Sequence, residues 1–513
     1  MKVLLVELSM ESAIVPGFNE FEEPIGLCYV GAAARRAGHE VRIIQQLLRS
    51  DEDVLAEVLH EHPQVLGFTA VTAVSTRVAE MARRTKRSIP NLVTVLGGSH
   101  ACAVPEAAAS EFDYVVIGEG EQTFVSLLSA LAVGSKPDFP GICYRRDGET
   151  VNTGYPDRIR RLDDLFPMRE GLSLTGYDPN GSPPVPHGTT GFAALVTSRG
   201  CSGYCSFCSN MSIWTDGSTG RVPVVLRSPE DVVAEVEYLR DEHGVNYIVF
   251  EDTDFLGRPR RQVLHLCDLL AHLTPSVRWA CLARPDGILG SWPASAKNLR
   301  EGIRLLEALS SAGCHLMCVG AESGDRSLRL SVGRDFENEQ LLAVFDAIYS
   351  ARIMAVAFLI LGLPGETPAS LARTRDMALQ LKAIRLRASF FYPFEGTPCA
   401  EVARTGRVAS RLASPECATT ELPTVECGVP AQELTGFRDA LLHEFYSGRS
   451  YQERLNEIAG WSDFWRETIS EWRRRLPRQV PVMPKERPNV GLSAGPRSLS
   501  ENPTSTKTVG TRC

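Results

Sequence analysis

The chain has 513 residues, of which 43% are hydrophobic and 23% are charged, and its formal net charge is −8. This length is too great for one ordinary hydrophobic core, so two or three domains are expected. The acidic balance and the lack of a run of Lys or Arg argue against nucleic acid as the main partner. We find no stretch of about eighteen apolar residues and no signal-peptide pattern, which favours a cytoplasmic protein. The 14 Cys residues are then read as buried thiols and metal ligands rather than disulfides.

The first 130 or so residues alternate apolar strands with helical patterns. Because strands buried on both faces read as continuous β-branched runs, this alternation predicts a doubly wound α/β domain over residues 1–135. Ligands of such domains bind at the carboxyl ends of the strands, where the loops of this chain are small and rich in Gly. The predicted strands are 2–7, 40–44, 65–69, 93–96 and 114–117, and the predicted helices are 26–37, 54–60, 75–87 and one from residue 122.

Residues 136–190 are expected to form a linker with a small hairpin. An Asp147-Gly148 turn of the hairpin type stands inside residues 141–155. Residues 180–186 are rich in Pro and Gly, which favours a linker or lid. The chain is then expected to continue as a second α/β domain, a helical cap and a disordered tail, over residues 191–410, 411–475 and 476–513.

Three Cys residues stand directly after a Gly near the start of the second domain, separated by three and then two residues: Cys201, Cys205 and Cys208. A short loop can wrap three thiolates around a [4Fe-4S] cluster and leave the fourth iron without a protein ligand. A closed zinc site would need a fourth Cys or His at short range, and none follows. The alternatives are a fragment of a zinc knuckle and three buried thiols.

Four more strands are predicted in the second domain, at 246–250, 279–283, 315–319 and 355–361. Polar or Gly-rich segments follow these strands and are expected to face one mouth, because ligands bind at the carboxyl ends of parallel strands. An acidic loop by itself is usually only solvated. These segments indicate a ligand-binding site only because they follow the three Cys residues in the same domain. The segments in question are 251–254, Arg284, 320–324 and 362–367.

The cysteine motif and these segments together resemble the radical S-adenosylmethionine (SAM) enzymes, whose open iron chelates the amino and carboxylate groups of SAM. The resemblance implies a partial (β/α)6 TIM-type barrel over residues 191–410, with the three Cys residues as cluster ligands. Glu366 can equally be a capping carboxylate of the next helix. The SAM-binding residues that the resemblance implies are Phe207, Glu251, Asp252, Glu322, Ser323 and Arg334.

The loops of the first domain resemble the cobalamin-binding domain that precedes the radical SAM core in one subgroup of that family. The segments most similar to the loops of that domain are residues 97–100 and 116–121. The family's Asp-x-His-x-x-Gly motif is missing, since residues 8–21 contain no His, so no imidazole from this loop is expected on cobalt. His100 is read as a hydrogen-bonding loop residue, and a Rossmann-like interaction domain is the alternative. The implied cobalamin-binding residues are Thr69, Thr72, Ser75, Gly97, Gly98, Gly118 and Glu119.

Cobalamin beside a [4Fe-4S] cluster and SAM is the cofactor set of class B radical SAM methyltransferases. The resemblance implies a 5′-deoxyadenosyl radical that removes a hydrogen atom and methylcobalamin that supplies a methyl group. The expected target is an unactivated carbon, or a phosphinate phosphorus, of a small molecule, with secondary-metabolite (antibiotic) biosynthesis as the setting. The expected partners are that substrate and an electron donor of the flavodoxin or ferredoxin type, with no nucleic acid and no membrane.

Three other functions remain open: a cobalamin-binding radical SAM cyclase or rearrangement enzyme, a methylthiotransferase and a cobalamin sensor. A methylthiotransferase would carry more cluster ligands in its first domain, and a sensor has no use for an open cluster. A second metal site would draw on Cys314, Cys318, Cys417 and Cys427. These four lack the tight Cys-x-x-Cys spacing of an auxiliary cluster, so buried thiols are the preferred interpretation. No catalytic acid or base stands out.

Overall fold

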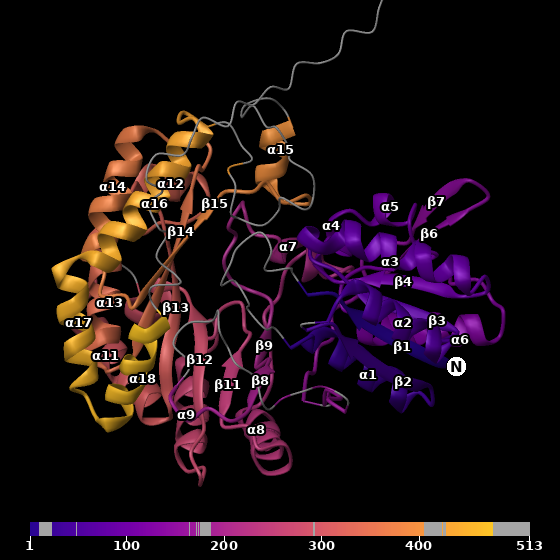
Figure 1. Ribbon diagram of the computed structural model, residues 1–513, viewed down its shortest axis with the longest axis horizontal. Helices are drawn as coiled ribbons and strands as arrows, with labels where there is room; N and C mark the ends of the chain where they lie inside the picture. Colours follow the sequence, from indigo (N-terminus) through magenta and orange to yellow (C-terminus); the bar gives the residue numbers. More distant parts are fainter. Residues whose placement is uncertain are drawn as a thin grey trace, which may run out of the picture. The chain divides into compact units, whose positions relative to one another are not determined.

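A computed structural model describes residues 1–9, 23–47, 49–163, 165–170, 172, 174, 186–290, 293–404, 423 and 427–475 (Figure 1). The chain divides into two compact units, Met1–Pro481 and Val482–Cys513, and the second lies outside the described residues. The predicted tail and most of the Pro-rich segment at 180–186 also lie outside them. Within the described ranges, no helix combines the length and apolarity needed to cross a membrane.

The N-terminal part is the expected doubly wound α/β domain. Its sheet has the strand order β2-β1-β3-β4-β5-β6-β7, and the first five strands run parallel. The four central residues of β1 are buried, as expected for a strand that is covered on both faces. These strands are β1 (Lys2–Glu7), β2 (Glu40–Gln45), β3 (Val65–Thr69), β4 (Val93–Gly97) and β5 (Tyr114–Val116).

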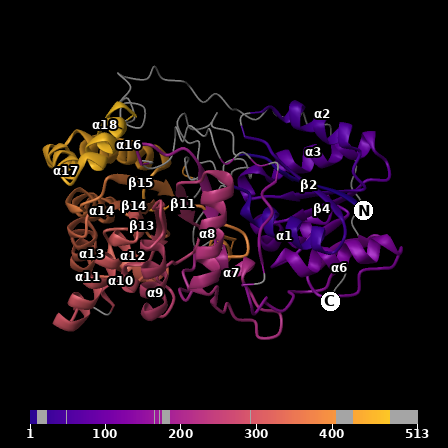
Figure 2. The same cartoon turned by 90° about the horizontal axis from the view of Figure 1, so that it is seen from below.

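Helices cover both faces of this sheet. The amphipathic helices α1 and α6 pack together on one face, and α2 and α3 pack together on the other (Figure 2). A capping box at Ser50 and Asp53 fixes the start of α2. The helical segments are α1 (Ile25–Arg36), α2 (Asp51–Glu61), η1 (Thr72–Val74), α3 (Ser75–Ser88), α4 (Ser99–Ala103), α5 (Pro105–Ala108) and α6 (Gly120–Ala132).

The hairpin expected in the linker consists of β6 (Ile142–Arg146) and β7 (Glu149–Asn152). Its turn places Asp147 and Gly148 at positive φ, as a hairpin turn of this type requires. The hairpin is an integral part of the domain, because β6 pairs antiparallel with β5 and extends the sheet. Burial of the apolar residues at the start of β6 accounts for this docking, which local sequence signals do not reveal.

The second sheet has six parallel strands in the order β15-β14-β13-β12-β11-β8, which confirms the partial (β/α)6 barrel. The helices α8, α9, α11, α13 and α14 contact one another in this order along the outside of the sheet (Figure 1). The strands are β8 (Phe192–Leu195), β11 (Tyr247–Phe250), β12 (Arg278–Ala283), β13 (Cys314–Glu322), β14 (Met354–Leu361) and β15 (Arg385–Phe390).

The Ser228 hydroxyl caps the start of helix α8 by accepting a hydrogen bond from the Asp231 amide, and the helix ends at Gly244 in a left-handed conformation. A short antiparallel pair, β9 (Ser198–Arg199) and β10 (Val225–Leu226), flanks the Cys residues. The helices are α7 (Asn210–Ile213), α8 (Pro229–His243), α9 (Arg260–Ala271), α10 (Pro285–Leu289), α11 (Ala296–Ser311), α12 (Arg326–Ser331), α13 (Asn338–Ser350), α14 (Pro368–Gln380) and α15 (Pro398–Arg404).

Three helices follow the barrel: α16 (Ala431–Ser447), α17 (Arg449–Ala459) and α18 (Asp463–Arg475). Trp465 and Trp472 are buried and belong to the same hydrophobic core as the barrel strands. The Trp472 indole also donates a hydrogen bond of 2.9 Å to the Tyr451 hydroxyl. Trp465 and Trp472 therefore attach the expected helical cap to the barrel through the shared core.

Candidate cofactor sites

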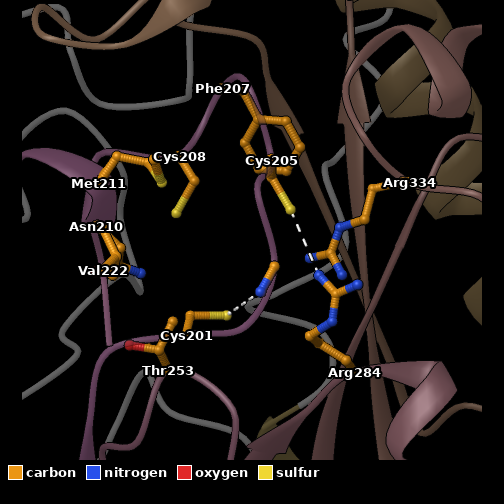
Figure 3. Close-up of a pocket in the computed structure, with 11 residues that line it drawn as sticks. Cys201, Cys205, Phe207, Cys208, Asn210, Met211, Val222, Thr253, Arg284 and Arg334 are labelled. Carbon is orange, nitrogen blue, oxygen red and sulfur yellow. Dashed lines mark hydrogen bonds between the residues drawn. The ribbon is translucent and has the colours of Figure 1, made fainter. Parts of the chain in front are cut away.

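The three motif Cys residues lie in one loop, residues 200–208, which we call the cysteine loop. Figure 3 shows their sulfur atoms facing a common space, and all three line a pocket of about 420 Å³. The Gly203 amide donates to the Cys201 sulfur at 3.3 Å, and the Arg284 guanidinium donates to the Cys205 sulfur at 3.6 Å. Both contacts supply positive charge where thiolates would need it.

The pocket lining offers three candidate metal ligands, the three Cys residues, whereas a closed zinc site needs four. Among the described residues, no three Cys, His, Asp or Glu side chains lie close enough together to hold a single metal ion. Three thiols that face one pocket suit a [4Fe-4S] cluster with one iron left open. Burial raises the pKa of the Cys201 and Cys208 thiols above the ordinary value, so metal binding at this loop must release protons.

An Arg with unsatisfied donors faces the same pocket (Figure 3). Arg334 Nη2 forms an ion pair of 3.0 Å with Glu322 Oε1, whereas Arg334 Nε and Nη1 are buried without a hydrogen-bond partner in the described structure. Burial raises the pKa of the Glu322 carboxyl, and Arg334 opposes this shift. These two unpaired guanidinium donors are available to a polar ligand of the pocket such as a carboxylate.

The backbone directs Glu322 towards this Arg. Glu322 ends β13 with a positive φ of 60°, and the register with β14 shifts between Gly320 and Glu322. A non-Gly residue in this conformation is strained and is found mainly where function requires it. The strain is thus located at the predicted SAM mouth.

Of the six predicted SAM-binding residues, only Phe207 and Arg334 line the pocket directly, and Glu322 reaches it through Arg334. Asp252 is buried and accepts hydrogen bonds from Thr197 and Ser198, so its carboxylate anchors the strand before the cysteine loop.

The other two predicted SAM-binding residues also lie away from the pocket lining. Glu251 is exposed, and the buried Ser323 hydroxyl contacts the Thr374 hydroxyl. Glu366 is buried as well, and it accepts from the Gly362 amide and the Ser370 hydroxyl, while Thr367 caps α14. The SAM-binding roles of these residues stay predictions.

Other residues that line the pocket carried no assignment from the sequence. Thr253 lies next to Asp252 in the loop after β11 and lines the pocket. Arg284 was visible as the residue after a predicted strand. Asn210, Met211 and Val222 lie beyond the motif, and no local signal marks them.

Replacing Arg334 with Met should weaken SAM binding at least tenfold and leave the iron content unchanged. Met fills similar space but removes the two unpaired donors that face the pocket. Equilibrium dialysis with the reconstituted protein measures the affinity. Arg84→Met removes a surface guanidinium that pairs with Glu52 and serves as the control. Equal SAM affinity in the Arg334 variant and the parent would refute this role.

A larger pocket of about 770 Å³ lies at the carboxyl ends of the N-terminal strands. Five of the seven predicted cobalamin-binding residues line it: Thr69, Gly97, Gly98, Gly118 and Glu119. The other two do not. The Thr72 hydroxyl lies 3.4 Å from His100 Nδ1, and the Ser75 hydroxyl donates to the Thr72 carbonyl. Most of the predicted first loop, residues 10–22, lies outside the described residues.

The pocket suits a bulky ligand because Gly residues form much of its wall. Gly98 has a φ of 90°, and a Cβ atom there would lie 2.6 Å from the Thr69 hydroxyl and 3.0 Å from the Ala70 backbone. At Gly67 a Cβ atom would lie 2.7 Å from the Leu5 side chain. Apolar side chains such as Val30 and Phe124 complete the wall. Only Gly permits this close approach of strands and loops.

Comparison with known proteins explains both pockets. Residues 13–128 match the family model of the B12 binding domain, and residues 195–378 match the model of the radical SAM superfamily. The chain belongs to the cobalamin-dependent radical SAM enzymes. Cobalamin, a [4Fe-4S] cluster and SAM are the cofactors of this family, and the Gly-lined pocket and the three-thiol pocket fit them.

Relatives within the family are named for different reactions, methyl transfer and cyclisation. An uncharacterized methyltransferase of Pyrococcus horikoshii is 28% identical over 407 residues, which are 77% of this chain and 82% of that protein. The anaerobic magnesium-protoporphyrin IX monomethyl ester cyclase of Cereibacter sphaeroides is 26% identical over 73% of this chain, but the match spans only 59% of the cyclase.

Among solved structures, the radical SAM methyltransferase TsrM of Kitasatospora setae has the same fold. It was solved with cobalamin and a [4Fe-4S] cluster bound. The TM-score is 0.66 at 18% sequence identity, and the match covers 93% of this chain and 99% of TsrM. At this identity the likeness concerns the fold, and the reaction has to be argued from the site.

Proposed function

We propose that the protein is a radical SAM methyltransferase that methylates an unactivated carbon, or a phosphinate phosphorus, of a small molecule. The observation that carries this proposal is the position of the cysteine loop beside the Gly-lined pocket. Arg199 and Trp214, which flank the three Cys residues in sequence, line that pocket. A methyl carrier in the Gly-lined pocket and a radical generator at the adjacent cysteine loop can act on one substrate.

When bound, the cluster supplies the electron that cleaves SAM into methionine and a 5′-deoxyadenosyl radical, and cobalamin carries the methyl group. The protein positions these groups. In the proposed site, Cys201, Cys205 and Cys208 hold the cluster and leave one iron open. Arg334 would bind the carboxylate of SAM through its unpaired donors, and Phe207 would contact the adenine.

The test is the stoichiometry of the reaction. Each methyl transfer should consume two SAM molecules, because one makes the radical and another recharges the methyl carrier. Reconstituted protein is incubated anaerobically with reductant, methyl-labelled SAM and an extract of source cells that lack the gene. We expect the label in a small molecule, with 5′-deoxyadenosine and S-adenosylhomocysteine formed in about equal amounts.

A cyclase or rearrangement enzyme is the second candidate, since a named cyclase matches 73% of this chain. That reaction would form 5′-deoxyadenosine without S-adenosylhomocysteine over several turnovers and would leave the product unlabelled. This result would overturn the methyltransferase proposal. The same extract tests whether the acceptor is a secondary metabolite, and reduction by flavodoxin or ferredoxin in place of a chemical reductant tests the proposed electron donor.

A further inference from the structure

Both ends of the cysteine-bearing segment are built into the wall of the Gly-lined pocket. Arg199 precedes the first Cys by two residues, and Ile213 and Trp214 follow the last Cys by five and six. All three line the pocket, whose other lining residues come from the N-terminal domain. Helix α7, which ends at Ile213, contacts α4 of that domain. The segment 199–214, which contains the cysteine loop, therefore starts and ends at this pocket.

Arg199 makes the strongest of these contacts. Its Nη1 donates to Glu119 Oε1 at 2.8 Å, and its Nη2 donates to Glu121 Oε1 at 2.6 Å. Both carboxylates belong to the start of α6, which also forms part of the pocket wall. The guanidinium and both carboxylates are at most 6% exposed, so the contact is a desolvated fork that fixes distance and orientation.

Two aromatic rings hold the same guanidinium. Its central carbon lies 4.8 Å from the centre of the Tyr29 ring and 5.8 Å from the Trp214 ring. Trp214 is further fixed by Arg158, which lies 4.9 Å from its ring centre, donates to its carbonyl at 2.9 Å, and also binds Glu119. The Trp214 indole N–H is buried and has no hydrogen-bond partner in the described structure, so a polar donor at the pocket wall remains to be satisfied.

The guanidinium of Arg199 and the carboxylates of Glu119 and Glu121 are all buried, so solvent does not compete for their contact. The fork ties one guanidinium to two carboxylates of the N-terminal domain. Lysine could keep the charge but could not reach two carboxylates in one plane. A change in the position of the cysteine loop must consequently move Glu119 and Glu121, and a change at these residues must move the loop.

We propose that Arg199 is a positioning residue that couples the cluster site to the cobalamin pocket, so that an assembled cluster raises the affinity for cobalamin. The inference rests on the proposed role of Cys201, Cys205 and Cys208 as cluster ligands. Coupling between two binding sites is reciprocal, so an increase in cobalamin affinity caused by the cluster implies an equal stabilisation of the cluster by cobalamin.

The experiment is a thermodynamic cycle with hydroxocobalamin as the probe. Its dissociation constant is measured by absorbance titration for the parent and for Arg199→Lys, each with four irons and after anaerobic removal of iron. We expect the cluster to tighten binding at least tenfold in the parent, about 1.4 kcal/mol, and less than twofold in Arg199→Lys. A purely structural role would weaken both forms of the variant equally and preserve the tenfold ratio.

Arg169→Lys is the matched control. Arg169 is also fully buried and forks between two carboxylates, those of Glu23 and Glu235, but it does not line the pocket. This control should keep the tenfold ratio. If Arg199→Lys fails to fold, Glu121→Gln keeps the side-chain volume, removes the negative charge from one arm of the fork and should also lower the coupling to less than twofold.

Two results would overturn the coupling: a tenfold ratio that persists in Arg199→Lys or Glu121→Gln, and a parent whose affinity does not depend on iron. Failure of the proposed function looks different. A parent that holds four irons but binds no hydroxocobalamin, or one that keeps its irons without Cys201, Cys205 and Cys208, would overturn the site assignment together with the coupling.

Discussion

Replacing Cys201, Cys205 and Cys208 together with Ala should abolish the oxygen-labile [4Fe-4S] cluster and all SAM cleavage. The three thiols line one pocket, and Ala offers no ligand to iron, so the reconstituted variant should fall from about four irons per chain to none. Iron and sulfide analysis measures the cluster. Formation of 5′-deoxyadenosine under reducing conditions measures SAM cleavage.

The control for this loss is a pair of buried Cys residues of the barrel strands. Cys281→Ala and Cys314→Ala remove thiols of the hydrophobic core without touching the pocket, so they should keep the full iron content. Their stability should fall modestly because a small side chain is truncated in a packed core. A complete cluster in the triple variant would disprove the ligand assignment.

Replacing Gly98 with Ala should weaken cobalamin binding at least a hundredfold, about 2.7 kcal/mol. The added Cβ atom would lie 2.6 Å from the Thr69 hydroxyl and 3.0 Å from the Ala70 backbone. A φ of 90° with extended ψ also belongs to the conformations that only Gly adopts readily. The loop must shift, and it forms the pocket wall. Titration with hydroxocobalamin gives the affinity, and circular dichroism confirms the fold.

Gly134→Ala isolates the effect of the pocket from that of backbone strain. Gly134 also has a positive φ, 66°, but a Cβ atom there meets nothing within 4 Å. It follows α6 and does not line the pocket, so this variant should bind cobalamin like the parent. Wild-type affinity in Gly98→Ala would show that cobalamin does not depend on this loop.

The sequence predicted both sheets because buried parallel strands carry continuous apolar runs, and it predicted the cysteine loop because three ligands lie within eight residues. It could not tell which side of a loop each polar residue faces. Asp252 and Thr253 are neighbours, yet the first anchors Thr197 and the second lines the pocket. That choice depends on how β8 and β11 pair, which is a long-range property.

Contacts between distant segments were likewise beyond a reading of local patterns. Arg199 was visible as the residue before Gly200 in the cysteine motif, and Glu119 as part of a Gly-rich loop, but 80 positions separate them. Their pairing depends on how the two sheets are packed, and no spacing rule links them. For the same reason, local patterns predicted the β6–β7 hairpin but not its pairing with β5.

That hairpin also affects how the protein behaves in a crowded solution. A parallel sheet that ended at β5 would present a row of unpaired amides and carbonyls beside buried valines, which invites another chain to add a strand. The hairpin moves this boundary outward to the short strand β7, and the charged residues around its turn are exposed: Arg145 and Arg146 at the end of β6, Asp147 in the turn and Glu149 at the start of β7. A four-residue edge strand that begins with a charged residue and is mostly exposed is a poor template for strand addition, which protects this side of the sheet against aggregation.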